Sequence, residues 1–123
     1  MPRDLFGVSV VTAGGRVFSA GDAEHEFAIM SVSKPFLFAL VCQALGPGEV
    51  RDKLGVNATG LPFNSLAAVE RGDGRTNPMV NSGAIATTSL VPGTTTEERW
   101  RFIHDGLSRF AGRRLAVNDE VYA

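Results

Sequence analysis

The stretch SVSKPFLFALVCQAL, residues 31–45, decides the fold because it predicts a helix that must lie inside a domain. From Phe36 to Leu45 nearly every residue is apolar, and a Gly-Pro-Gly cluster at 46–48 ends the segment. A helix that is apolar on all sides is covered by neighbouring elements. The same stretch begins with Ser31 and Lys34, a polar pair at the entrance to this helix.

The Ser-x-x-Lys pair has two interpretations on its residues alone. If Ser31 opens the helix, Lys34 lies one turn on and on the same face, within reach of the serine hydroxyl. A lysine can take a serine proton once burial and nearby positive charge depress its pKa, and helix N–H groups beside the serine suit an oxyanion. The alternative is that Ser31 or Ser33 caps the helix while Lys34 extends outward. Pro35 favours this alternative, because it pushes the preceding residue away from helical geometry and the helix would then start at Pro35.

Elements on either side of this helix can also be predicted. Two β-rich runs, Phe6–Val11 and Arg16–Ser19, flank a Gly-containing turn at 13–15 and indicate a hairpin. A short helix is expected around residues 50–54. Asn77 is expected to cap a further helix of small residues, with Pro78 in its first position. The small side chains of that helix, Gly83, Ala84 and Ala86, allow its backbone to lie close to a neighbour.

Residues 94–112 predict a helix with one apolar face. Thr94 with Glu97, and Thr95 with Glu98, are alternative capping boxes. Gly112 closes the segment, and the tail after it predicts no terminal element. The apolar stripe recurs at helical spacing and is interpreted as core: Trp100, Ile103, Leu107 and Phe110.

The composition is typical of a soluble globular domain, with 44% of the 123 residues hydrophobic and 20% charged. The formal net charge is −1 with both signs interspersed, so no nucleic acid or anionic lipid partner is indicated. Cys42 is the only cysteine, which excludes an internal disulfide and fits a reducing compartment; within the helix it is interpreted as core. The longest apolar run, residues 36–42, is far shorter than the roughly 20 residues of a spanning helix. We therefore expect a cytoplasmic protein without a membrane partner.

Three blocks, taken together and in order, resemble the serine-dependent glutaminase family. They are SVSKPF at 31–36, GVNATGLPFNSL at 55–66 and NPMVNSGAIATTSL at 77–90. The resemblance implies a partial β-lactamase/transpeptidase-like α+β domain, with residues 1–123 forming one domain truncated at both ends relative to the family. It also implies hydrolysis of L-glutamine to L-glutamate and ammonia without a metal or an organic cofactor. Family members commonly form dimers or tetramers, so a homo-oligomer is expected.

The resemblance also implies roles for particular residues. Ser31 is the nucleophile that takes the acyl group, Lys34 is its proton acceptor and Asn81 holds the substrate. An amide suits a ligand that bears both a carboxylate and an ammonium, although without the resemblance a role in satisfying nearby backbone is favoured for Asn81. Met30 stands where the family usually has glutamine, and its thioether cannot replace an amide's donor and acceptor, so weaker substrate binding is expected. Ser82 replaces the usual alanine, a mild change.

Other assignments remain open on the sequence. A penicillin-recognising acyl hydrolase also uses Ser-x-x-Lys, but it needs a Lys-Thr-Gly element that does not occur here. A non-catalytic remnant, or a partner-bound module, is the alternative of a different class and would expose apolar surface. His25 and His104 could serve a serine triad, but no motif supports either, and exposed or capping roles are favoured.

Overall fold

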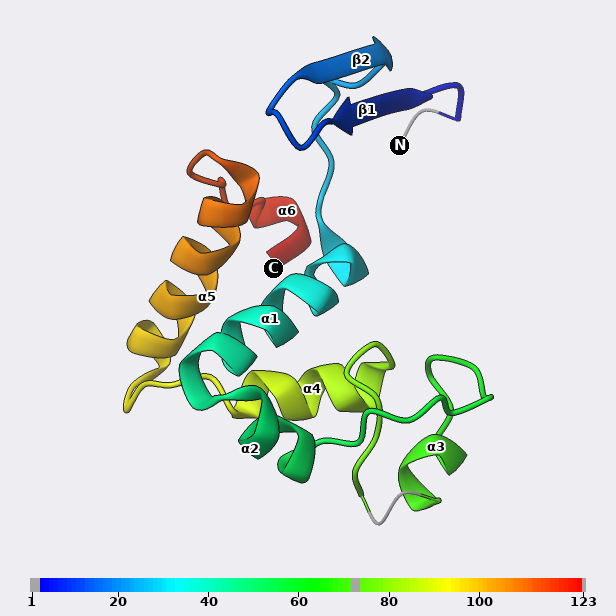
Figure 1. The fold of residues 1–123 in the computed structure, drawn as a ribbon, viewed down its shortest axis with the longest axis vertical. Coiled ribbons are helices and arrows are strands. Elements are labelled where there is room, and N and C mark those ends of the chain that lie inside the picture. Colours follow the sequence, from blue (N-terminus) through cyan, green and yellow to red (C-terminus); the bar gives the residue numbers. More distant parts are fainter. Residues whose placement is uncertain (1–2, 72–73, 123) are drawn as a thin grey trace.

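A β-hairpin and a body of helices make up the fold (Figure 1). The structure is a computed structural model that describes residues 3–71 and 74–122. Strands β1 (Gly7–Val11) and β2 (Val17–Gly21) come first, as the sequence predicts. The following elements are η1 (Met30–Val32), α1 (Ser33–Leu45), α2 (Pro47–Lys53), α3 (Ala67–Glu70), α4 (Asn81–Ser89), α5 (Thr96–Ala111) and α6 (Asp119–Tyr122).

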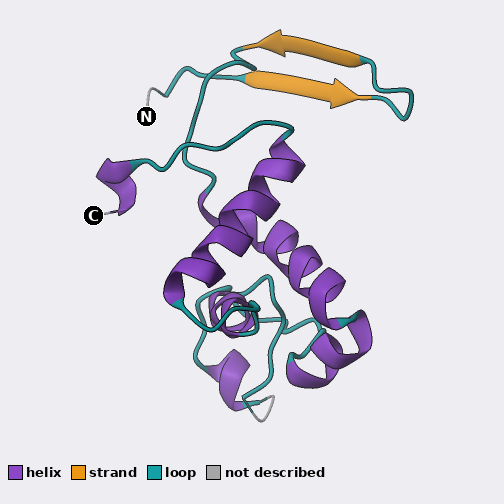
Figure 2. Cartoon of the chain, turned by 90° about the vertical axis from the view of Figure 1, so that its left-hand side faces the viewer, coloured by secondary structure: helices purple, strands orange, loops and turns teal. Residues whose placement is uncertain are grey.

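The hairpin confirms the predicted antiparallel pair, with each strand shifted by one or two residues from its expected bounds. Its register places Val10 opposite Phe18 and Ser9 opposite Ser19. The Thr12 N–H donates to the Arg16 carbonyl oxygen at 2.9 Å and closes the turn. Every residue of both strands is exposed, and Figure 2 shows the hairpin standing apart from the helices. The hairpin is therefore held by its own ladder and turn.

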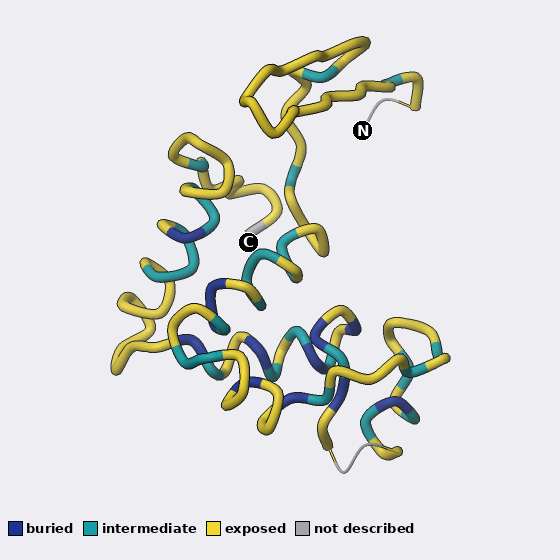
Figure 3. Tube along the Cα trace, in the orientation of Figure 1, coloured by how far each residue is buried: buried dark blue, intermediate teal, exposed yellow. Residues whose placement is uncertain are grey.

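The hydrophobic core lies where α1 meets α2, α4 and α5. Val41 of α1, Val50 of α2, Leu54 and Val91 are fully or almost fully buried and pack together. Figure 3 shows buried stretches, in dark blue, in the helical body and none in the hairpin. The central placement of this helix confirms the prediction from its apolar sequence. Burial on all sides was the wrong expectation, because Ala39, Gln43 and Ala44 are exposed.

Helix α1 begins two residues before Pro35, so the alternative in which the helix starts at Pro35 is wrong. Val32 and Ser33 both have right-handed helical backbone angles, and the η1 turn runs directly into α1. Pro35 is the third residue of the helix. The first N–H groups of a helix have no intrahelical partner, so a proline there removes no hydrogen bond. Lys34 is consequently part of α1, as the functional interpretation requires.

Helix α4 begins at Asn81, so Asn77 is not its cap. Val80 is extended, with φ −87° and ψ 159°, and the helix cannot run through it. Asn77 instead forms a turn: its side-chain oxygen accepts the Met79 N–H at 2.8 Å, and its carbonyl oxygen accepts the Val80 N–H at 3.1 Å. The expected close approach is confirmed at Gly83, where a Cβ would collide with the Asn77 backbone. Helix α2 also begins earlier than expected, at Pro47.

Helix α5 has the second of the two predicted capping boxes. Thr95 is the N-cap and accepts the Glu98 N–H at 3.2 Å, and Glu98 accepts from the Thr95 N–H at 3.3 Å. Gly112 ends the helix in the left-handed region with φ 65°. The apolar stripe is only partly core: Trp100 is 45% exposed and Phe110 54% exposed. The Phe110 ring nevertheless contacts the Phe36 ring of α1, with 5.1 Å between the ring centroids. Helix α6 was not expected.

The contact between α1 and α5 predicts the effect of a single methyl group. Gly106 of α5 is buried, and a Cβ there would collide with the buried Leu40 side chain of α1. We expect Gly106→Ala to lower the free energy of unfolding by about 1–3 kcal/mol, the usual cost of overpacking. Gly48→Ala is the matched control, because Gly48 lies in α2 with open space around it. The free energy of unfolding of this variant should rise by about 0.5–1 kcal/mol. Urea denaturation of both variants measures the difference, and equal changes would contradict the packing.

The capping box predicts a pH dependence of stability. Backbone and side-chain hydrogen bonds from Thr94, with a further backbone bond from Thr95, hold the pKa of Glu98 below its usual 4.5. A lowered pKa means that the carboxylate stabilises the fold above its unfolded pKa, and that this contribution is lost as the pH falls through the folded pKa. We expect the melting temperature of Glu98→Gln to be lower than that of the wild type at pH 7 and equal to it in strong acid. Thermal melts by circular dichroism measure this, and a difference that is constant with pH would contradict it.

Candidate active site

The start of α1 and the first turns of α4 enclose a hollow of about 410 Å³. All four residues that the sequence singles out line it: Met30, Ser31, Lys34 and Asn81. They come from two segments almost fifty residues apart, which α1 and α4 bring together by packing on each other. The hollow is open to solvent, and Ser31 and Asn81 are both exposed. The predicted site residues therefore share one surface depression.

Lys34 is the best-anchored side chain in this hollow. Its Nζ donates to Asn81 Oδ1 at 2.6 Å and to the Met79 carbonyl oxygen at 3.3 Å. The Phe63 ring lies 5.8 Å from the same nitrogen, within the range of a cation–π contact. Lys34 is half-buried, so the alternative in which it extends outward to solvent is wrong.

Ser31 lies on the η1 turn, one residue after Met30 and two before α1 begins. Within residues 3–71 and 74–122, no hydrogen bond joins the Ser31 hydroxyl to Lys34 Nζ. The contact expected from their spacing is therefore not made directly, although both residues line the hollow. Lys34 donates to two oxygen acceptors on the segment that leads into α4.

Met30 holds an unusual backbone conformation next to Ser31. Its φ of 44° lies in the left-handed region, which costs a residue with a side chain about 1–2 kcal/mol. Ser33 supports this turn, because its Oγ donates to the Met30 carbonyl oxygen at 2.7 Å. The Met30 side chain is 67% exposed at the edge of the hollow. Strained backbone of this kind is often found at functional sites.

Two residues near the site were not identified from the sequence, and a third, Ser33, was considered only as a helix cap. Phe63 contacts Lys34 through its ring, and its carbonyl oxygen accepts the Asn81 N–H at 2.8 Å. Met79 contributes a carbonyl oxygen and Ser33 a hydroxyl. Phe63 lies inside the second sequence block and Met79 inside the third. Their place in these blocks was the only feature of the sequence that could have pointed to them. No pattern in a single sequence shows which backbone carbonyl will accept from a lysine.

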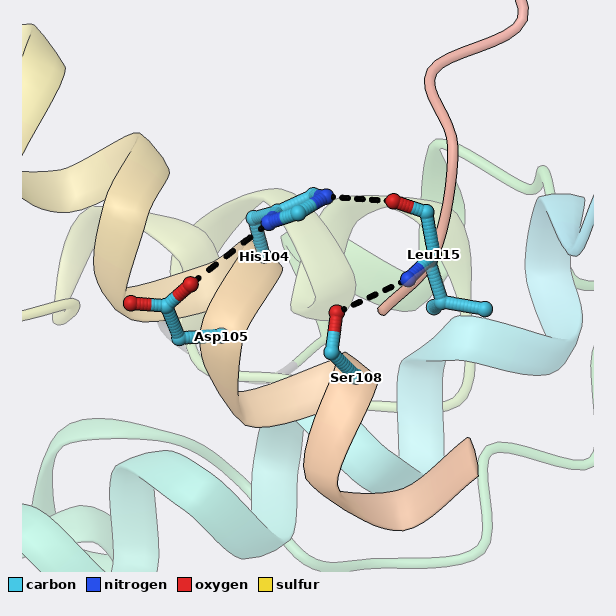
Figure 4. A network of polar contacts seen from close by, with 4 residues as sticks. All are labelled: His104, Asp105, Ser108 and Leu115. Carbon is cyan, nitrogen blue, oxygen red and sulfur yellow. Dashed lines mark hydrogen bonds and ion pairs between the residues drawn. The ribbon is translucent and has the colours of Figure 1, made fainter. Parts of the chain in front are cut away.

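Neither histidine forms part of this hollow. His104, which is half-buried, has its Nε2 2.8 Å from the Leu115 carbonyl oxygen, while its Nδ1 lies 3.6 Å from an Asp105 carboxylate oxygen (Figure 4). Ser108 Oγ accepts the Leu115 N–H at 3.1 Å. These contacts attach the tail after α5 to that helix, so His104 has a structural role. His25 is exposed, as expected.

Metal-binding clusters and membrane-spanning helices can be assessed within residues 3–71 and 74–122, which the structure describes. No group of three or more His, Cys, Asp or Glu side chains there could hold a metal ion. No helix in the same ranges has the length and apolarity needed to cross a membrane. Cys42, inside α1, is a free thiol whose pKa is raised by burial, and it packs against the core as predicted.

Comparison with known proteins identifies the family. A family model described as glutaminase matches residues 1–123. The chain belongs to the glutaminase family. Among curated relatives of this glutaminase-family chain, glutaminase 2 of Yersinia pestis is 67% identical over 123 residues, which are 99% of this chain and 36% of the relative. A glutaminase of Mycobacterium ulcerans is 50% identical over 124 residues, which are 100% of this chain and 39% of the relative.

Solved structures agree with the family assignment. A probable glutaminase superposes with a TM-score of 0.94 at 45% identity, covering 98% of this chain and 40% of that one. A probable glutaminase of Bacillus subtilis gives 0.86 at 32% identity, over 94% of this chain and 38% of that one. A protein named Mglu, solved in its glutamate form, superposes with a TM-score of 0.86 at 38% identity. The match covers 99% of this chain and 28% of that one. The fold of these residues is thus that of the matching part of the glutaminases, as the resemblance implied.

The glutaminase-family chain is much shorter than these relatives. It spans between 36% and 39% of the length of the curated relatives named above. The high TM-score over 98% of this chain shows that these residues have the same fold as the matching part of a longer protein.

Proposed function

We propose that this chain carries the acylation residues of a glutaminase, which hydrolyses L-glutamine to L-glutamate and ammonia. The observation that supports this most strongly is that Ser31, Lys34 and Asn81 line one hollow in a chain of the glutaminase family. A serine and a lysine at a helix start can perform acyl transfer, because the lysine amine can accept the serine proton. The chemistry needs no metal ion or organic cofactor.

In the first half of the reaction, Ser31 Oγ attacks the side-chain amide carbon of glutamine. A C–O bond forms while the serine proton passes to the neutral amine of Lys34. Lys34 then gives that proton to the leaving nitrogen, the C–N bond breaks and ammonia departs. Free N–H groups at the start of a helix can stabilise the negative oxygen of such an intermediate. The product of this half is a glutamyl ester of Ser31.

In the second half, water replaces ammonia. Lys34 accepts a proton from the water as it attacks the ester carbon, and then returns a proton to Ser31 Oγ as the ester C–O bond breaks. Glutamate is released and both side chains return to their starting protonation states. The same lysine therefore serves as base and acid in each half.

Asn81 and Met30 are proposed to contact the substrate. An asparagine amide carries two N–H donors and a carbonyl oxygen, which suit the carboxylate and ammonium of an amino acid. Mglu, whose structure includes a glutamate form, is a neighbour at 38% identity and supports a ligand of this class. Met30 offers only an exposed thioether at the hollow's edge, so we infer weaker substrate contacts than a glutamine would make there.

Glutamate release by the purified chain tests the proposal. We expect Ser31→Ala to lower the rate of glutamate formation from L-glutamine by about a thousandfold or more, because the acyl acceptor is lost. Ser82→Ala is the matched control: it replaces a half-buried serine beside Asn81 and should retain the wild-type rate. An enzyme-coupled glutamate assay measures all three proteins. Equal rates for the wild type and Ser31→Ala, or no activity in either, would contradict a catalytic role for this chain.

A second candidate, a module that works bound to another polypeptide, is favoured by the exposed hairpin. Val10 and Phe18 are 54% and 59% exposed on one face of a two-stranded sheet. In the described residues the outer edge of each strand has no partner strand. Such edges and apolar faces promote association. The exposed hairpin also supports the homo-oligomer, a dimer or tetramer, that we infer for the protein.

We propose the cytoplasm as the location of the protein. The half-buried free thiol of Cys42 fits this reducing compartment.

Association through the hairpin is open to a direct test. We expect the chain to form concentration-dependent oligomers in sedimentation velocity, and we expect Phe18→Ser to shift the distribution toward the monomer because apolar area is removed from the contact. Val117→Ser is the control, since Val117 is 43% exposed but lies in the tail after α5. A chain that stays monomeric on concentration, or an equal response to both substitutions, would argue against the hairpin as a contact surface.

A further inference from the structure

We propose that the hollow beside Ser31 also hydrolyses esters of apolar carboxylic acids, and that the acyl chain lies against an apolar wall between α1 and α4. The apolar wall consists of Leu37 of α1 together with Ala84 and Ile85 of α4. The inference rests on the proposed function, because the same serine and lysine perform the acyl transfer. It adds a second class of substrate, the short-chain acyl esters, which carry no amino-acid group.

The position of the apolar wall relative to the reacting groups is the first support. Leu37 follows Lys34 by about one helical turn, so both side chains lie on the same face of α1. Ala84 and Ile85 follow Asn81 by about one turn on α4. Leu37 is half-buried and packs against the hydrophobic core, whereas Ile85 is 72% exposed. The hollow therefore leads from the polar starts of the two helices to apolar side chains that a ligand can contact.

Several hydroxyl groups around the hollow are already engaged by the backbone. Ser33, Thr87 and Thr88 each donate the hydroxyl hydrogen to a carbonyl oxygen three or four residues earlier, at 2.7, 2.7 and 2.9 Å. Thr87 is in addition almost completely buried. These hydroxyls have no hydrogen left to donate to a ligand, because each carries only one. The lining beyond the first turns of α1 and α4 therefore offers a ligand mainly apolar contact.

The charges around the hollow also suit an acyl group that carries none. An amino-acid substrate brings an ammonium, which a carboxylate binds most strongly. Among the described residues that line the hollow, Lys34 is the charged one, and no Asp or Glu is present. Met30, at the edge, offers a flexible thioether where the family usually has glutamine, and a thioether adapts to apolar ligands. An ester with an apolar acyl chain needs neither the carboxylate nor the amide.

The ester reaction uses the same two steps as amide hydrolysis. Ser31 Oγ attacks the ester carbonyl carbon, a C–O bond forms, and the serine proton passes to the neutral amine of Lys34. The C–O bond to the alcohol then breaks, and the alcohol leaves with the proton that Lys34 returns. Water attacks the acyl-serine carbon and gives a proton to Lys34, which passes it to Ser31 Oγ as that bond breaks. The products are one carboxylic acid and one alcohol.

The dependence of the rate on acyl length tests the inference. The purified 123-residue chain receives p-nitrophenyl acetate, butanoate or hexanoate, and the absorbance of released nitrophenol gives kcat/KM. Ser31→Ala supplies the background rate for each ester. We expect kcat/KM above this background to rise about threefold for every two methylenes added to the acyl chain. Complete burial of two methylenes would give a larger rise, but the hollow is open to solvent.

Ile85→Gln tests the apolar wall itself. Glutamine is a good helix former, and Ile85 is exposed, so the substitution should leave the fold intact. We expect the rise of kcat/KM with acyl length to disappear in this variant, because the acyl chain loses an apolar contact. Val121→Gln is the matched control: Val121 lies in α6, is 56% exposed and does not line the hollow. This control should keep the rise seen in the wild type.

The outcomes separate this inference from the proposed function. A rise that the wild type and Val121→Gln share and Ile85→Gln lacks supports the apolar wall. Ester hydrolysis that depends on Ser31 but not on acyl length, or a rise that Ile85→Gln keeps or Val121→Gln also loses, overturns the wall and leaves the proposed function standing. If the wild type forms glutamate from L-glutamine but hydrolyses every ester at the Ser31→Ala rate, the ester activity alone is overturned. If neither substrate class shows a rate that depends on Ser31, both proposals fail.

Discussion

The hydrogen bond from Lys34 Nζ to Asn81 Oδ1 joins the two segments that make the candidate site. Lys34 belongs to the first turn of α1, and Asn81 is the first residue of α4. The loop between α2 and α3 joins the same point through the ring and the carbonyl oxygen of Phe63. Three segments that are distant in sequence thus meet at one amine, and the hollow beside Ser31 is lined by two of them.

This meeting point depends on how α1 starts. The η1 turn must lead into α1 without a break, so that Ser31 and Lys34 stay on neighbouring turns. Met30 takes the left-handed conformation that begins this turn, and Ser33 holds the Met30 carbonyl oxygen in place. The strain is local and is tolerated because the second half of α1 is fixed by the core around Val41. A rigid helix therefore supports an unusual turn at its exposed end.

The core and the site differ in how complete they are. Around Val41 the packing of α1 with α2, α4 and α5 is dense enough that Gly106 has no room for a methyl group. Around the hollow Met30, Ser31 and Asn81 are exposed, and both faces of the hairpin are open to solvent. Relatives that contain these residues are more than twice as long. The described residues thus form a self-consistent helical core that carries an open site.

The sequence by itself determined the features that depend on neighbouring residues. The hairpin, the capping box of Thr95 and Glu98, and the left-handed end at Gly112 follow from local hydrogen bonds and backbone freedom, and the structure contains all three. The family blocks also indicated Ser31, Lys34 and Asn81. Only the tertiary structure decided where α4 begins, which parts of the α5 stripe are covered, and that Lys34 donates to Asn81. Those outcomes depend on which segments lie within a few ångströms of each other after packing, and that distance has no signature in the order of residues along one chain.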